Sequence, residues 1–228
     1  MNPKLIDNIK INNFYILNLI VLYCLLHLKA CASDLPGYKV VQANHWYGTQ
    51  RFNITKNLIR IDNSYGHMLL STNDELVTIY NDKTKKIAFL KPVELADSVF
   101  GRDKIEDKNL RSYMFVKKQV EHGFNVYKYE RDTVNKGITL VSYIYTLPDI
   151  EISKPLTATL KAILNYTIPY FPSKEITFYK TSNGLMTKPF IHYYTSDIAK
   201  VKFTDNTFKP PKDYTKVNSL AAILWDEK

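Results

Sequence analysis

Polar and apolar residues alternate along most of the chain after residue 37, which is typical of strands with one buried face. Arg51–Thr55 shows the pattern clearly, with Phe52 and Ile54 between polar neighbours. Similar segments recur between turns rich in Asn, Asp and Gly, which predicts a series of antiparallel hairpins. The dipeptide Asn183-Gly184 is the strongest turn signal. The expected strands are 51–55, 58–61, 68–70, 76–80, 87–90, 124–129, 138–145, 175–181, 185–194 and 199–203.

Two segments depart from this alternation and predict helices. In the main one, residues 153–166, the apolar positions form one stripe at i, i+4, i+7 and i+8: Leu156, Leu160, Ile163 and Leu164. Ser153 stands where it can cap this helix, and prolines follow its end. A shorter helix is expected around Val93–Val99, at the start of a charged and irregular stretch, 94–112, that continues as a loop. We expect the apolar stripe of the main helix to pack against the sheet.

The N-terminal segment contains an apolar run, Phe14–Leu28, that is too short to cross a bilayer. As a helix it would extend about 22 Å, against a hydrocarbon core of roughly 30 Å. Lysines precede the run and small residues follow it, as in a secretory signal. Ala30-Cys31-Ala32 fits a signal-peptidase site, whereas Leu28–Cys31 resembles a lipobox, in which Cys31 would carry a lipid anchor and Lys29 breaks the pattern. The sequence favours cleavage after Ala32 over lipidation, and both over an uncleaved anchor.

This interpretation divides the chain into a signal peptide at 1–32 and a single domain at 33–228. Both cysteines, Cys24 and Cys31, then lie in the signal, so the mature chain would have neither a disulfide nor a cysteine-bound metal. A core that needs no disulfide favours an exported bacterial protein, in the periplasm or associated with the outer membrane. The full chain carries 31 basic and 22 acidic residues, a formal net charge of +9. Because the lysines are spread along the sequence, we expect no nucleic acid as a partner and only weak attraction to an anionic membrane surface.

The sequence offers no pattern of a catalytic site. The histidines of the mature chain lack metal-ligand spacing, and neither a nucleophile elbow nor a glycine-rich phosphate loop occurs. We therefore expect no enzyme activity, no catalytic residue, no metal and no cofactor. A hydrolase whose residues are scattered over several strands ranks behind a lipid-binding protein and behind a structural or interaction module.

Three segments together resemble the periplasmic lipoprotein-carrier family, the outer-membrane lipoprotein-sorting proteins and their lipid-binding relatives. They are FNITKNLIRID (52–62), LLSTNDELVTIYNDKTKKIAFL (69–90) and FTDNTFKPPKDYTKV (203–217). The resemblance implies an α+β fold in which a curved antiparallel sheet, an incomplete barrel, has one main helix and a short helix covering its concave side. It also implies that acyl chains are held between the sheet and the helices, without a cofactor or a catalytic group.

One residue and one missing element follow from the same resemblance. In the carriers a basic residue near the second strand helps to hold the lid closed, and Lys56 falls near that position. The alternative role for Lys56 is that of a solvated turn lysine. The carriers begin with a helix, whereas here residues 34–37 run directly into the apolar segment Tyr38–Val41. The missing helix implies a more open groove or a different cargo.

The expected ligand site is an apolar groove between the sheet and the main helix. Burial of an acyl chain contributes about 0.8 kcal/mol per methylene, so such a groove can bind without a polar contact. The alternative is a filled core, which would make the protein a structural or protein-interaction module of the cell envelope. The partner expected in the groove is a lipid or the acyl chain of a lipoprotein. The groove residues predicted are Phe52, Ile54, Phe89, Tyr143, Leu156, Leu160, Ile163, Leu164 and Phe178.

Overall fold

A computed structural model of the chain describes residues 34–100, 112–121, 124–135, 138–164, 166–180 and 186–224, apart from the side chains at 99–100, 133–135, 138 and 164. The chain divides into two units, Met1–Asp34 and Leu35–Lys228, and the described strands and helices all belong to the second. The predicted signal peptide and the predicted turn at Asn183-Gly184 lie outside the described residues.

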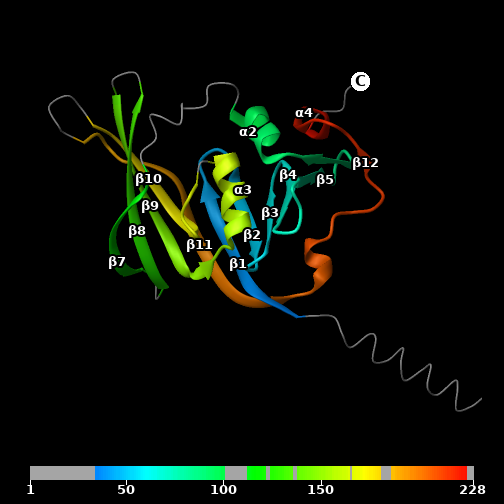
Figure 1. Ribbon diagram of the computed structural model, residues 1–228, viewed down its shortest axis with the longest axis horizontal. Helices are drawn as coiled ribbons and strands as arrows, with labels where there is room; N and C mark the ends of the chain where they lie inside the picture. The colour runs from blue at the N-terminus through cyan, green and yellow to red at the C-terminus, as the bar shows by residue number, and fades with distance from the viewer. Residues whose placement is uncertain are drawn as a thin grey trace, which may run out of the picture. The chain divides into compact units, whose positions relative to one another are not determined.

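The described part of the second unit is built on one 12-stranded sheet (Figure 1). The strands stand in the order β12-β6-β5-β4-β3-β2-β1-β11-β10-β9-β8-β7, so β12 and β7 form the two edges of an open sheet. Neighbouring strands are antiparallel except β12 and β6. The bounds are β1 Leu35–Asn44, β2 Gly48–Ile54, β3 Leu58–Asn63, β4 Gly66–Ser71, β5 Val77–Asn81, β6 Lys86–Leu90, β7 Met114–Glu121, β8 Phe124–Asn135, β9 Ile138–Glu151, β10 Tyr170–Lys180, β11 Phe190–Phe203 and β12 Thr215–Lys216.

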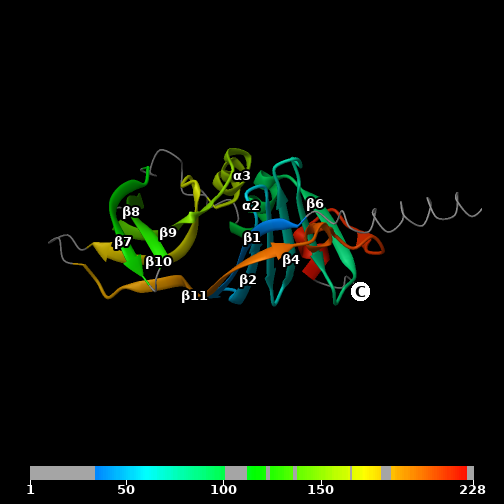
Figure 2. The same cartoon turned by 90° about the horizontal axis from the view of Figure 1, so that it is seen from below.

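Short helices accompany the sheet and give the α+β class that the sequence predicts. The helices of the described residues are α2 Pro92–Phe100, α3 Lys154–Leu164, α4 Leu220–Leu224 and the 3₁₀ helix η2 Asp205–Phe208. Figure 2 shows the sheet curving, with β8, β9 and β10 bending round on one side. None of these helices is long and apolar enough to cross a membrane.

The main hydrophobic core lies on the sheet face that α2 and α3 cover. Because side chains alternate along a strand, β1 to β6 send every second residue to this face, and most of those positions are apolar, with Gln42 of β1 a buried polar exception. Leu95 of α2, Leu156 of α3 and Ile223 of α4 belong to the same core cluster and are at most 1% exposed. Leu156, Leu160 and Ile163 of the predicted helical stripe are thus on the face that α3 buries.

Several local features differ from the sequence expectation. The hydroxyl of Ser153 has no hydrogen-bond partner among the described residues; instead the Ser153 carbonyl accepts a bond from the amide of Thr157 at 2.9 Å. Edge strand β7 was not predicted, because its run of MFVKKQVE does not alternate cleanly. Pro172, one of the prolines expected to follow the end of the helix, lies within β10 at a register shift, where a strand tolerates proline.

Candidate functional site

Five of the nine predicted groove residues meet in the core beneath α3. The side chains of Phe52, Ile54, Leu156, Leu160 and Ile163 are between 0 and 9% exposed and belong to one cluster. The ring of Phe52 packs edge-on against that of Phe171, with 5.1 Å between the centroids. Their burial favours the filled-core arrangement that the sequence allowed as the alternative. Binding of an acyl chain at this place stays a prediction.

Two other predicted residues, Tyr143 and Phe178, lie apart from this core. Their rings are partly exposed neighbours on β9 and β10, in edge-to-face contact at 5.6 Å. The ammonium of Lys128 stands 3.5 Å from the centroid of the Tyr143 ring. The pKa of the Tyr143 hydroxyl is raised, first by burial and then by the charge of Glu130. The arrangement is an aromatic and cationic surface of the sheet. The last residue of the predicted helical stripe, Leu164, has its side chain outside the described residues.

Lys56 lies in the turn between β2 and β3 and is well exposed. Its ammonium approaches the Glu151 carboxylate at 3.9 Å, and 69% and 62% of the two side chains are exposed. An ion pair so open to solvent contributes little to stability. Both residues border a pocket of about 360 Å³ that Tyr38 and Lys200 also line. The proposed role of Lys56 in closing a lid stays a prediction.

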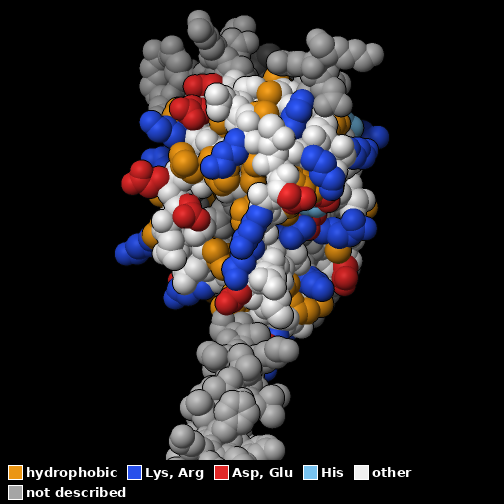
Figure 3. Space-filling view, turned by 90° about the vertical axis from the view of Figure 1, so that its right-hand side faces the viewer, with side chains coloured by type: hydrophobic (Ala, Val, Ile, Leu, Met, Phe, Trp, Pro, Cys, Tyr) orange, Lys and Arg blue, Asp and Glu red, His pale blue; other side chains and the backbone are white. Residues whose placement is uncertain are grey.

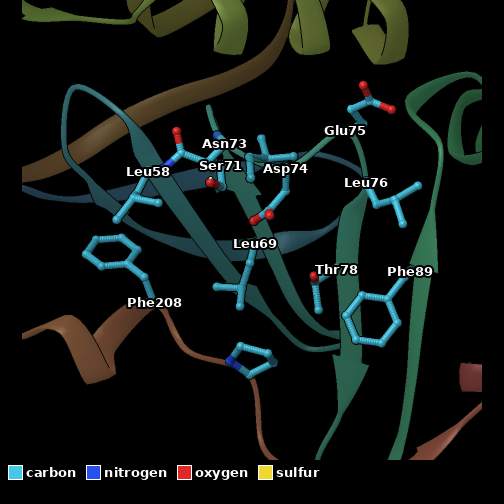
Figure 4. Close-up of a pocket in the computed structure, with 12 residues that line it drawn as sticks. Leu58, Leu69, Ser71, Asn73, Asp74, Glu75, Leu76, Thr78, Phe89 and Phe208 are labelled. Atoms are coloured by element: carbon cyan, nitrogen blue, oxygen red, sulfur yellow. Dashed lines mark hydrogen bonds between the residues drawn. The ribbon is translucent and has the colours of Figure 1, made fainter.

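The apolar pocket with the larger volume, about 450 Å³, lies on the sheet face opposite α2 and α3 (Figure 4). Its floor comes from the outward residues of β3 to β6, among them Leu58, Leu69 and Phe89. Phe208 at the end of η2 and the following Pro210 close the other side. Phe89 is 40% exposed, so one of the nine predicted residues does face an open apolar site. We call this site the outer pocket.

One rim of the outer pocket is acidic. The loop between β4 and β5 contributes Asn73, Asp74 and Glu75, followed by Leu76, which is 39% exposed. Figure 4 draws the Asp74 and Glu75 carboxylates beside this apolar wall. An anionic group would be repelled at this rim, whereas an apolar chain contacts the leucine and phenylalanine side chains.

The C-terminal segment that closes the outer pocket, residues 205–217, is held to the sheet by polar contacts. Arg60 donates to the carbonyl of Thr207 at 3.0 Å, and the Tyr214 hydroxyl donates to Asp82 at 2.6 Å. The bond from Tyr214 is the main reason that the pKa of the Asp82 carboxyl is lowered. Strand β12 then pairs with β6. The segment is therefore anchored on both sides of Pro210.

His67 of β4 links the two carboxylates that accept hydrogen bonds from Arg60 and Tyr214. His67 Nδ1 lies 2.5 Å from Asp62 and its Nε2 lies 3.0 Å from Asp82, while its ring stacks on Tyr80 at 4.6 Å. Asp62 also accepts a bond from Arg60 at 2.8 Å. Among the described residues no group of His, Cys, Asp and Glu has the arrangement of a metal site. The network is a set of structural contacts that orients the segment over the pocket.

Surface charge on this side of the protein is mixed. Figure 3 shows Lys and Arg side chains distributed among apolar and acidic ones on the side that carries β12 and the C-terminal segment. Lys85, in the turn between β5 and β6, contacts the Tyr214 ring at 5.0 Å and its hydroxyl at 3.2 Å. Its charge is thereby part of the local contacts that hold the segment.

Comparisons with known proteins give little further information. No family model matches the chain, and no curated protein sequence matches it. A solved structure titled "Structure of PNGF-II in C2 space group" is similar over 82% of this chain, with a TM-score of 0.46 and 12% sequence identity. This chain spans 32% of the length of that protein. The site must therefore be judged from its own residues.

Sequence reasoning missed the outer pocket for a specific reason. Leu58, Leu69 and Phe89 look like ordinary strand residues, and the sequence does not show which face the helices leave open. The available signal was the run TFKPPKDY (207–214), whose apolar and proline residues suggest a segment lying over a sheet. That run belongs to the family resemblance, but its residues alone do not indicate a site.

Proposed function

We propose that the protein is a non-catalytic binding protein that holds a lipid or an acyl chain in the outer pocket. The observation that supports this function is the apolar pocket of about 450 Å³ between β3–β6 and the segment containing Phe208 and Pro210. Its volume lies in the ordinary range for small-molecule sites, roughly 300–1,000 Å³. The proposal keeps the ligand class expected from the sequence and moves the site to the other face of the sheet.

The energetics of such a site suit an acyl chain. Each buried methylene contributes about 0.8 kcal/mol, so eight methylenes contribute about 6 kcal/mol before the entropic cost of association. The acidic rim at Asp74 and Glu75 favours an orientation in which an anionic headgroup stays away from that end. The ligand's polar end would then remain in solvent, which is compatible with a carrier that must release its cargo.

A titration of the purified chain with decanoate and with decyltrimethylammonium, followed by calorimetry, tests this proposal. The change Phe89→Ser removes a large wall residue that is already 40% exposed, so the fold should survive. We expect it to weaken binding of both ligands at least about fivefold. Phe115→Ser on β7, where the ring is 57% exposed, is the matched control and should leave binding unchanged. Equal affinity of the wild type and the Phe89 variant would contradict the outer pocket as the site.

Two finer aspects of the proposal concern the fold and the compartment. We regard the curved sheet as an incomplete barrel with α2 and α3 on its concave side, as in the lipoprotein carriers. We also propose that residues 1–32 direct export, with the mature protein in the periplasm or at the outer membrane, either free or anchored through Cys31. The intact mass of the protein made in a bacterial host distinguishes an N-terminal Ser33 from a lipidated Cys31.

A second candidate function, a protein-interaction module of the envelope, is favoured by one observation on edge strand β7. Its side chains Met114, Phe115, Val116 and Val120 are between 43 and 68% exposed. Exposed apolar residues on a free sheet edge are typical of surfaces that pair with another chain. Native mass spectrometry after gentle extraction separates the two functions. Bound fatty acid or phospholipid supports the carrier, and a stable protein complex without lipid supports the module.

A further inference from the structure

The outer pocket is closed by a segment of chain that polar contacts hold at two points. We call residues 205–217 the closing segment; its contribution to the pocket wall is Phe208 and Pro210. On one side of these residues, the Thr207 carbonyl accepts a hydrogen bond from the sheet at 3.0 Å. On the other side, the Tyr214 hydroxyl donates one to the sheet at 2.6 Å. The position of this pocket wall therefore depends on both attachments.

The two attachments meet at His67 of β4. Arg60, the donor of the first attachment, also donates to Asp62 at 2.8 Å, and Asp62 lies 2.5 Å from Nδ1 of the histidine ring. Asp82, the acceptor of the second attachment, lies 3.0 Å from Nε2 of the same ring. One continuous chain of side chains thus connects the two ends of the closing segment, with the imidazole at its centre.

The geometry at His67 fixes the number of protons on its ring. Both ring nitrogens face a carboxylate oxygen, and an ionised carboxylate only accepts hydrogen bonds. The pKa of the Asp82 carboxyl is lowered, mainly by the bond from Tyr214, so this group is ionised at neutral pH. Each nitrogen must then carry a proton, and only the positively charged imidazolium has both. The observed contacts are those of the charged ring.

Other groups around the ring act on its charge in both directions. Nη2 of Arg60 lies 3.4 Å from Nδ1, and the Lys85 ammonium lies one hydrogen bond further away, on the Tyr214 hydroxyl at 3.2 Å. Both oppose the positive ring, whereas the stacked face of Tyr80, at 4.6 Å, favours it. The two carboxylates are in direct contact with the ring, and the His67 side chain is 18% exposed, so solvent screens these contacts only in part.

From this arrangement we propose that His67 is a pH-sensitive clasp, which holds the closing segment over the outer pocket while its ring carries both protons and loosens it as the pH rises. Histidine is the side chain that ordinarily changes its charge between pH 5 and 8. The contribution of the charged ring to closure is complete at the acidic end of this range and is lost toward the alkaline end. Retention of a ligand rests on the proposed function of the outer pocket, whereas the movement of the segment does not.

Loss of one ring proton breaks the chain of contacts at a defined place. A neutral imidazole donates from one nitrogen and has a lone pair on the other. A proton on Nε2 keeps the bond to Asp82, and the lone pair on Nδ1 then opposes the Asp62 oxygen and attracts the guanidinium of Arg60. This attraction draws Arg60 away from the Thr207 carbonyl. The attachment beside Phe208 therefore loosens first.

Amide hydrogen exchange of the full chain, followed by NMR between pH 5.5 and 8, tests the clasp. Protection factors are compared, because they remove the intrinsic pH dependence of exchange. The amides of Thr207 and Lys209 report on one end of the segment, through bonds of 3.0 and 3.3 Å, and those of Thr215 and Val217 report on the other, through bonds to the backbone at 85–87. We expect protection at Thr207 and Lys209 to fall at least about fivefold with rising pH, and to fall there first.

Two histidine variants assign the effect. His67→Gln is neutral at every pH, so it should show low protection at 207 and 209 and a flat pH profile. His45→Gln, the same change at an exposed histidine in the turn between β1 and β2, should keep the profile of the wild type. Circular dichroism confirms that both are folded. In the wild type, the loss of protection should follow the NMR titration of the His67 ring, a measurement that needs no variant.

The outcomes separate the clasp from the proposed function. Constant protection across the pH range, a wild-type profile in folded His67→Gln, or a loss of protection that does not follow the His67 titration would each overturn the clasp. Calorimetry with 1-octanol, which is uncharged at every pH, tests the ligand: the wild type should bind it at least about threefold more weakly at pH 8 than at pH 5.5, and His67→Gln equally at both. Equal wild-type affinities at the two pH values would overturn the control of retention. If octanol and decanoate fail to bind at any pH, the proposed function fails, and the exchange result still decides the clasp.

Discussion

Leu156 provides the sharpest test of whether the space beneath α3 is a filled core or a groove. Its side chain is 0% exposed and belongs to the cluster that also contains Ile54 and Leu95. The change Leu156→Ala removes three carbon groups, whose transfer from water contributes about 2.4 kcal/mol. A cavity term adds to this value, so we expect the free energy of unfolding to fall by about 3 kcal/mol, within the usual range of roughly 2–5.

Urea unfolding followed by circular dichroism measures this loss. Lys161→Ala, at an exposed position of the same helix, is the control and should change the free energy of unfolding by less than about 0.5 kcal/mol. A loss below about 1 kcal/mol for Leu156→Ala would refute the filled core, because it would mean that the space around Leu156 tolerates a missing side chain. Decanoate that stabilised the wild type by binding beneath α3 would likewise refute the filled core.

Three further predictions concern other parts of the structure. Gln42, 3% exposed, donates to the half-buried carbonyl of Pro172 at 2.6 Å, so Gln42→Leu removes this bond and should lower the free energy of urea unfolding by about 1–3 kcal/mol. Tyr214→Phe removes the main cause of the lowered pKa of Asp82. That carboxyl contributes stability above its ordinary pKa and loses this contribution as the pH falls through the lowered value. The variant should therefore lose at most about 1 kcal/mol of unfolding free energy at neutral pH and show a smaller further loss on acidification, with amide exchange rising first at 215–217. Burial raises the pKa of the Glu175 carboxyl on β10, so its contribution to stability is present at acidic pH and lost as the pH rises through the raised value; Glu175→Gln should therefore raise the melting temperature at neutral pH and change it little near pH 4.

The hairpin region near the N-terminus of the domain was predictable because its signals are local. Alternation in 51–55, the turn at Lys56-Asn57 and the apolar run at 87–90 each depend on neighbours in sequence, and β2, β3 and β6 appear at those places. The helical stripe of α3 was predictable for the same reason. Edge strand β7 was not, since its residues are exposed and its pattern is set by pairing with β8.

The candidate sites were harder to predict because they depend on which face of the sheet each strand presents. Phe52 and Phe89 are both phenylalanines within predicted strands, yet Phe52 faces the helices and Phe89 lies in the outer pocket. A one-residue difference in register decides between these outcomes. His67 gave no sequence signal either, because a single histidine in a strand does not show which carboxylates lie beside it.

The sequence alone determined the kind of secondary structure in most segments and the apolar stripe of α3. It also shows no recognised catalytic motif. These features depend on residues that are close neighbours in the sequence. The tertiary structure decided the rest: the pairing of β1 with β11, the closure of the outer pocket by the segment around Phe208, and the contact of Tyr214 with Asp82. These contacts join residues that lie far apart in sequence. Their positions follow from strand order and register, which a linear pattern does not encode.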